Sequence, residues 1–282
     1  MNTGLQTLAH LDDVGSTSGS VQAWKKLREA GVIRSASCMV PCPWYRAAVE
    51  DYHADPAQDL GLHITLNSEW NNYRWRPLTG RVKGLVDAEG FFHHRPEGTL
   101  ASASPEAVSD EIEARIERAM ADGIRPSHLD AHMGTAFLPP FAEKLFDLAR
   151  KYSIPLPLIE DAGALWNIVN IPGLRQEALR ETFEEGRRLG FPVFRKFLIG
   201  FVSPGEETES FFGEMLRNAP SGRNWLAIHA DAGPEIEIIS APKAFPRLAE
   251  YRYFSQKDSG KIFTGNGTEI INWRDIPNPE KP

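Results

Sequence analysis

Acidic residues and histidines follow three apolar, strand-like runs of the sequence. Asp12 and Asp13 end the first run, His63 lies in the second, and His128-Leu129-Asp130-Ala131-His132 ends the third. A carboxylate and two imidazoles from separate strands form an open set of ligands for a divalent ion, with positions left for water and substrate. The pattern therefore favours a metal-dependent hydrolase.

Each group taken alone also has a purely structural interpretation. Two aspartates before Gly15 are typical of a turn. A single histidine in an apolar strand, such as His63, is often a hydrogen-bonded core residue, and His132 alone is equally ambiguous. Their occurrence together at three strand ends favours the metal site. The remaining histidines without a recognisable partner are predicted to be structural or at the surface: His10, His53, His93 and His94.

Length, charge and composition restrict the class of protein. A chain of 282 residues suits one α/β barrel, so we expect a single catalytic domain over residues 1–282. The net charge of −7 and the absence of a basic stripe argue against a nucleic-acid partner. No apolar run is long enough to span a membrane and the first residues do not resemble a signal peptide, which predicts a cytoplasmic protein. Cys38 and Cys42 are predicted to be buried thiols.

Strand and helix patterns alternate along most of the chain. This alternation predicts a parallel sheet that closes into a distorted, TIM-barrel-like (β/α) barrel of about seven strands. Residues 67–103 form a long loop excursion in this scheme, and the clearest helix follows Ser104 and Pro105, a capping residue and a favoured first residue. Strands are expected at 6–13, 35–41, 59–66, 127–132, 154–159, 193–201 and 225–231, and helices at 21–30, 45–53, 105–121, 141–152, 176–189 and 206–218.

Alternation of side chains along a strand predicts which residues share the barrel interior. His63 falls on the polar face of its strand, and the same period of two groups His128 with Asp130 and His132, and His229 with its polar neighbours. Asp12 and Asp13 are the exception, because neighbours in a regular strand point to opposite faces. Both reach one site only where the strand breaks, and the glycine at position 15 supplies a break.

The order of these motifs resembles a known family. Asp-Asp-x-Gly, then Gly-x-His-x-x-Leu-Asn, then His-Leu-Asp-x-His, then a late strand with a histidine, is similar to the YdjC-like (ChbG/HpnK) family of carbohydrate deacetylases. Residues 76–78 and 84–92 are also similar, and the resemblance covers most of the chain. It implies a barrel-like α/β fold and metal-dependent removal of acetyl groups from N-acetylated sugars.

The resemblance also assigns roles to individual residues. It implies that Asp13, His63 and His132 bind the metal, that Asp12 is the general base, and that His229 is the late-strand active-site histidine. In the mechanism that follows, the metal polarises the acetamide carbonyl, Asp12 takes a proton from water, and His229 protonates the departing amine. The products are acetate and an amine.

Departures from the family pattern leave the substrate and the metal open. Two family histidines are absent from residues 133–136, alanine at position 230 replaces the usual proline, and residues 155–160 contain no arginine. The metal ligands are unaffected, but the usual chitooligosaccharide substrate is not implied. Zinc, nickel, cobalt or magnesium all remain candidates for one divalent ion. Asp130 is predicted either to orient a ligand or to cap backbone amides.

The aromatic start of the loop excursion is a candidate substrate platform. Trp70, Tyr73, Trp75 and Arg76 are predicted to contact an acetylated sugar, because aromatic faces cover the apolar side of a pyranose. Alternatively, the tryptophans only fix the loop. Two other functions stay open: a metal-dependent sugar isomerase or aldolase, and a carbohydrate-binding protein without turnover. A homo-oligomer is also left open.

Overall fold

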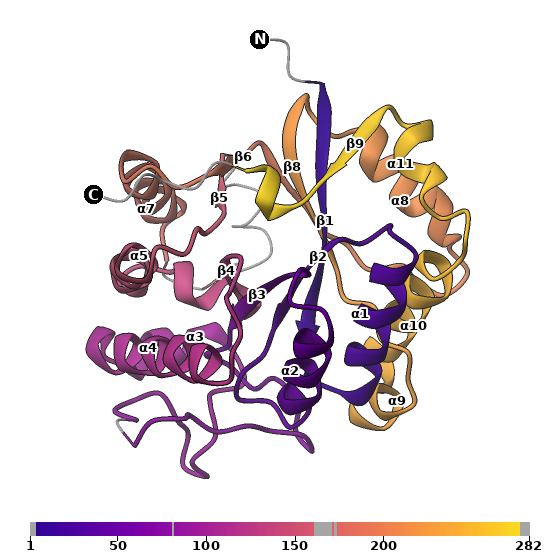
Figure 1. Ribbon diagram of the computed structural model, residues 1–282. Coiled ribbons are helices and arrows are strands. Elements are labelled where there is room, and N and C mark those ends of the chain that lie inside the picture. Colours follow the sequence, from indigo (N-terminus) through magenta and orange to yellow (C-terminus); the bar gives the residue numbers. More distant parts are fainter. Residues whose placement is uncertain (1–3, 81, 161–170, 172–173, 277–282) are drawn as a thin grey trace.

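Parallel strands surrounded by helices make up the centre of the computed structural model, which describes residues 4–80, 82–160, 171 and 174–276 (Figure 1). The main sheet has the strand order β4-β3-β2-β1-β8-β7. β9 pairs with β1 from Leu5 to Leu8, whereas β2 pairs with the later part of β1, from His10 onwards. The strands are β1 (Leu5–Val14), β2 (Ser35–Cys38), β3 (Asp59–Ile64), β4 (Leu129–Ala131), β7 (Lys196–Leu198), β8 (Gly222–Ile228) and β9 (Thr268–Ile271).

A short second sheet continues the curvature of the first. It consists of β5 (Leu158–Ile159) and β6 (Val193–Phe194). Backbone hydrogen bonds connect this region to the main sheet, from Leu129 N to Pro155 O at 2.8 Å and from Arg195 N to Arg223 O at 2.7 Å. The predicted α/β fold with a distorted barrel is therefore confirmed, in the form of a curled half-barrel.

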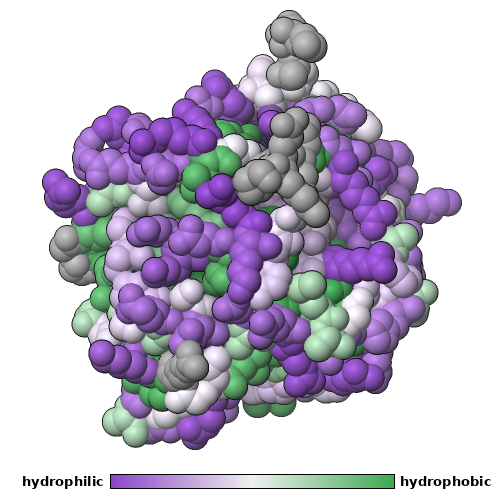
Figure 2. Space-filling view, turned by 60° about the vertical axis from the view of Figure 1, so that its left-hand side comes forward, coloured by the Kyte–Doolittle hydropathy of each residue, from purple (hydrophilic) through white to green (hydrophobic). Residues whose placement is uncertain are grey.

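Amphipathic helices cover the outside of the sheet, because neighbouring parallel strands must be joined by crossover connections. The buried faces of these helices pack on the apolar face of the strands, and hydrophilic residues cover most of the molecular face in Figure 2. Ser104 accepts a hydrogen bond from Ala107 N at 3.2 Å, which explains the start of α4 at Pro105. These helices are α1 (Ser18–Glu29), α2 (Tyr45–Ala54), α4 (Pro105–Ala121), α5 (Phe141–Tyr152), α7 (Gln176–Arg188), α8 (Thr208–Arg217) and α10 (Ala241–Phe254).

Several elements differ from the sequence-based expectation. The strand expected at 127–132 is only Leu129–Ala131, and the one expected at 225–231 ends at Ile228, so His132 and His229 lie just beyond strands. The strand expected at 193–201 is interrupted at Arg195. Seven of the described elements were not predicted: the strand β9, the helices α3 (Pro96–Ser102), α9 (Glu235–Ile239), α10 and α11 (Lys261–Gly265), and the 3₁₀ helices η1 (His132–Phe137) and η2 (Trp273–Asp275). Among the described residues, no helix is long and apolar enough to cross a bilayer.

Candidate active site

Three buried side chains from three strand ends meet at one point. His63 Nε2 lies 3.3 Å and His132 Nδ1 lies 3.1 Å from the same oxygen, Asp13 Oδ1. Donor atoms of all three residues lie within 4.8 Å of one another. Ligand atoms bound tetrahedrally at about 2.0–2.2 Å are separated by about 3.3 Å. The spacing and the nitrogen-and-oxygen donor set therefore fit a metal ion.

A β-bulge brings both aspartates to this site. Leu11 pairs with Ala36 and Val14 pairs with Cys38, so Asp12 and Asp13 together oppose one residue of β2. Asp13 has a φ of 63°, a left-handed conformation that aspartate tolerates better than most residues. The break that the glycine at position 15 was expected to supply therefore begins at Asp13 itself. Bulges commonly redirect a side chain next to an active site in this way.

Asp130 holds His63 in its orientation. Asp130 Oδ1 lies 2.8 Å from His63 Nδ1, and its other oxygen accepts a hydrogen bond from Ser37 Oγ at 2.8 Å. The pairing of β3 with β4 places His63 directly opposite Asp130. Because the carboxylate engages Nδ1, the other ring nitrogen of His63 is directed at Asp13. Asp130 was expected either to orient a metal ligand or to cap backbone amides. Its contact with His63 matches the first of these roles.

Glu69 performs the corresponding role for His132. Its Oε2 lies 3.0 Å from His132 Nε2, while Nδ1 of the same ring faces Asp13. His132 is set at this position by two residues in left-handed conformations, Met133 with φ 53° and Gly134 with φ 69°. Glu69 was missed at the level of sequence. Its position two residues after the Leu-Asn motif could have indicated that it lies near the site.

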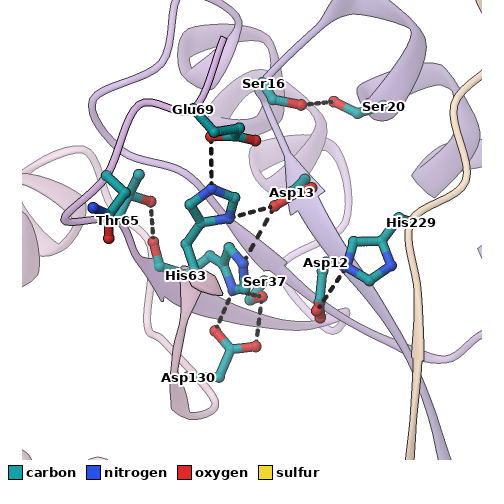
Figure 3. Close-up of polar contacts among 12 residues, drawn as sticks. Asp12, Asp13, Ser16, Ser20, Ser37, His63, Thr65, Glu69, Asp130 and His229 are labelled. Atoms are coloured by element: carbon teal, nitrogen blue, oxygen red, sulfur yellow. Dashed lines mark hydrogen bonds and ion pairs between the residues drawn. The ribbon is translucent and has the colours of Figure 1, made fainter. Parts of the chain in front are cut away.

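A second pair, Asp12 and His229, lies beside the three candidate ligands. Asp12 Oδ2 is 3.5 Å from His229 Nε2, and Figure 3 shows Asp12 turned towards His229. Helix α10 fixes this region. Glu250 Oε2 accepts a hydrogen bond from His229 N at 2.6 Å, and Arg247 contacts Asp13 Oδ2 at 2.6 Å.

Arg247 and Glu250 were not recognised from the sequence. They are spaced i and i+3 on one face of α10, but the helix itself was not predicted. A charged residue on an unrecognised helix cannot be assigned to a site by spacing alone.

Opposing charges shift the pKa values of the cluster. Burial alone would raise the pKa of Asp13 and lower that of His132. Arg247 and His132 instead hold the pKa of Asp13 well below its usual range, and Glu69 and Asp13 raise the pKa of His132 to about 9. The pKa of His63 is raised by Asp130 and Asp13 despite burial. Carboxylates thus stabilise positive charge at this point, which is what a cation site requires.

The second pair has the opposite electrostatic character. Burial raises the pKa of Asp12 to about 7, although His63 and His10 act to lower it. Burial lowers the pKa of His229 to about 3. Asp12 therefore changes protonation state near neutral pH, while His229 is a neutral imidazole there.

Asp12, Asp13, His63, His132 and His229 all line one cavity of about 480 Å³. This volume is within the range of small-molecule sites. Among the predicted sugar contacts, Trp70 also lines it.

The other three predicted sugar contacts each donate a hydrogen bond to a backbone carbonyl group. Tyr73 Oη donates to Ser16 O, Trp75 Nε1 donates to Asn67 O, and Arg76 donates to Gly90 O. Their contact with a sugar stays a prediction.

The remaining histidines and the cysteines have structural surroundings. His128 is stacked on Trp273, with ring centroids 4.7 Å apart, and His10 is fully buried with Nε2 3.1 Å from Asp130. His53 and His93 contact backbone carbonyl groups. Both cysteines are buried free thiols, as predicted.

The chain is similar to a known protein family and to named relatives. A model of the family described as YdjC-like protein matches residues 8–263. A carbohydrate deacetylase of Thermus thermophilus is 31% identical over 95% of this chain and 92% of that protein. A carbohydrate deacetylase of Thermoanaerobacter pseudethanolicus is 27% identical over 94% of this chain and 97% of that protein.

A solved structure supports the fold. The chain is similar to a protein of Enterococcus faecalis described as a putative cellobiose-phosphate cleavage protein, with a TM-score of 0.76 and 20% identity over 97% of this chain and 99% of that one. At this level of identity, the likeness concerns the fold alone.

Proposed function

The chain belongs to the YdjC-like protein family, and on this basis we propose that it is a metal-dependent hydrolase that removes the acetyl group from an N-acetylated sugar. The observation that carries the proposal is the buried cluster of Asp13, His63 and His132 beside the Asp12 and His229 pair. The two relatives that match over nearly their whole length, both named carbohydrate deacetylase, support the reaction class.

Asp13, His63 and His132 hold one divalent ion in this proposal. Zinc, nickel, cobalt and magnesium are the candidates, and the two imidazoles favour the first three on grounds of ligand type. When bound, the ion supplies Lewis-acid chemistry by polarising the acetyl carbonyl and lowering the pKa of water. Asp130 and Glu69 orient the two histidines, and Arg247 fixes the second oxygen of Asp13.

Asp12 is the general base. Its pKa of about 7 lets a substantial fraction be ionised at neutral pH while the acid form also remains accessible, which is the condition for efficient proton transfer. The β-bulge brings Asp12 and Asp13 to the same site, so the proposed base lies beside the proposed metal ligands. The proton then resides on Asp12.

His229 delivers this proton to the leaving amine. Because burial keeps His229 neutral, it is a proton donor only after receiving a proton. Asp12, whose Oδ2 lies 3.5 Å from His229 Nε2, is the neighbouring source. The hydrogen bond from His229 N to Glu250 fixes the backbone of His229 during this transfer.

Acetate release is the direct test. Purified protein is incubated with a panel of N-acetylated sugars after removal of metal and after addition of each of the four ions, and acetate is measured enzymatically. We expect acetate only in the presence of an ion, together with an equimolar amount of free amine. A sugar isomerase, an aldolase or a binding protein would release no acetate, so its absence with every sugar and ion would refute the proposal.

A further inference from the structure

One side of the active-site cavity is apolar, in contrast to the side that carries the candidate ligands. Every second residue from Phe197 to Phe201 lines the cavity, and these three residues, Phe197, Ile199 and Phe201, are all apolar. The ends of β1, β3 and β4 and the residue after β8 instead place acidic residues and histidines in the cavity wall. The cavity thus has one polar and one apolar wall.

The apolar wall includes residues from other elements. Ile159 from β5, Phe183 from α7 and Phe137 from η1 also line the cavity. These three are buried, but Phe197 and Ile199 are partly exposed and Phe201 has an exposed fraction of 43%. Large apolar side chains left open inside a concave site indicate a ligand with an apolar surface.

The position of this wall relates it to one part of the substrate. The Phe201 ring lies 5.4 Å from the ring of His229, the residue that delivers the proton to the amine. In the proposed reaction, the acetyl group instead lies at the proposed metal ligands Asp13, His63 and His132. The apolar wall therefore lies towards the amine-bearing part of the substrate and not towards the acyl group.

We propose that the amine-bearing part of the substrate carries an apolar group, such as an alkyl or aryl aglycone of an N-acetylated amino sugar, which packs on Phe197, Ile199 and Phe201. The Lys243 ammonium lies 4.8 Å from the centre of the Phe201 ring, so the wall ends in a charged group near Phe201. The inference rests on the proposed function for its orientation.

Binding to an inactive variant tests this inference. Isothermal titration calorimetry of Asp12→Asn compares methyl, hexyl and phenyl glycosides of N-acetylglucosamine. We expect the hexyl and phenyl glycosides to bind about tenfold more tightly than the methyl glycoside, the gain from burying two or three carbon atoms. Ile199→Asn, added to the same background, removes most of this difference. Ile238→Asn changes an isoleucine with an exposed fraction of 78% and leaves the difference unchanged.

Equal affinity for the three glycosides, or no binding by any of them, overturns the inference. An equal loss of preference in the Ile199→Asn and Ile238→Asn variants also overturns it. Acetate release from the methyl glycoside by the unmodified protein reports on the proposed function separately. Release of acetate without a preference for apolar glycosides refutes only the inference, whereas a preference without any release refutes only the deacetylase reaction.

Discussion

Individual side chains at this site lie in pairs, each consisting of one proposed metal ligand and one group that contacts it. Asp130 holds His63, Glu69 holds His132, and Arg247 holds Asp13. Such outer contacts set the direction and basicity of a metal ligand. Residue types at strand ends predicted the inner members of these pairs. The outer members Glu69 and Arg247 come from a loop and a late helix, where spacing carries no comparable signal.

Glu69→Gln is expected to weaken metal binding by roughly 10–100-fold, because it removes the carboxylate that faces His132. Equilibrium competition with a chromophoric chelator measures the affinity. Glu97→Gln, which neutralises another carboxyl group of the cavity wall, is the matched control and should bind metal like the unmodified protein. Equal metal affinities in the two variants would show that Glu69 does not support metal binding through His132.

The pH dependence of turnover reports on Asp12. A general base must be ionised, and burial raises the pKa of Asp12 to about 7. We therefore expect kcat/KM to rise with pH and to fall by about tenfold per pH unit well below the pKa of Asp12. Steady-state kinetics from acidic to alkaline pH, with the ion at saturation, provide the measurement. A rate that stays constant from about two pH units below this pKa up to neutrality would contradict the assignment.

The bounds of the helices were easier to predict from the sequence than those of the strands. Long helices with clear starts, such as Pro105–Ala121 and Phe141–Tyr152, have the predicted bounds. The strands expected at 127–132 and 225–231 were predicted too long at their carboxyl ends, because the histidines there belong to the site and lie beyond the sheet. The bulge at Asp12 and Asp13 depends on a pairing register with β2 that no local pattern specifies.

Gly61 provides a test at the level of two neighbouring strands. A Cβ at this position would lie 2.4 Å from Cε1 of the buried His128 ring, so Gly61→Ala must displace β3 or β4. We expect a loss of about 1–3 kcal/mol in the free energy of unfolding. Urea denaturation followed by circular dichroism measures it.

Gly80→Ala is the control for this substitution, because a Cβ there meets nothing within 4 Å. Its free energy of unfolding should change by less than about 0.5 kcal/mol. If Gly61→Ala were as stable as Gly80→Ala, the close packing of His128 against β3 would be wrong.

If the proposed site binds a metal, metal binding and protonation compete for the same two histidines, and this competition affects the stability of the whole protein. In the metal-free protein the carboxylates raise the pKa of His132 to about 9 and also raise that of His63. His132 therefore carries a proton at neutral pH, and any proton on either histidine must leave when a metal binds. Affinity for the metal should fall as pH falls, by up to about tenfold per pH unit for each histidine.

Thermal unfolding makes this competition measurable. A ligand that binds only the folded state stabilises it by an amount that grows with the logarithm of the ratio of ligand concentration to Kd. At one concentration of zinc, we expect a larger increase in melting temperature at mildly alkaline pH than at mildly acidic pH, measured by scanning calorimetry. An increase of the same size under both conditions would show that the histidines do not release protons to the metal.

We propose that metal binding and proton transfer reside on different members of one cluster of side chains. Metal content and acetate release, measured together on three variants, test it most directly. Asp12→Asn should keep stoichiometric metal and lose turnover by about 10²–10⁴-fold, whereas His63→Ala and His132→Ala should each lose the metal. Full turnover in Asp12→Asn, or stoichiometric metal in either histidine variant, would contradict the account.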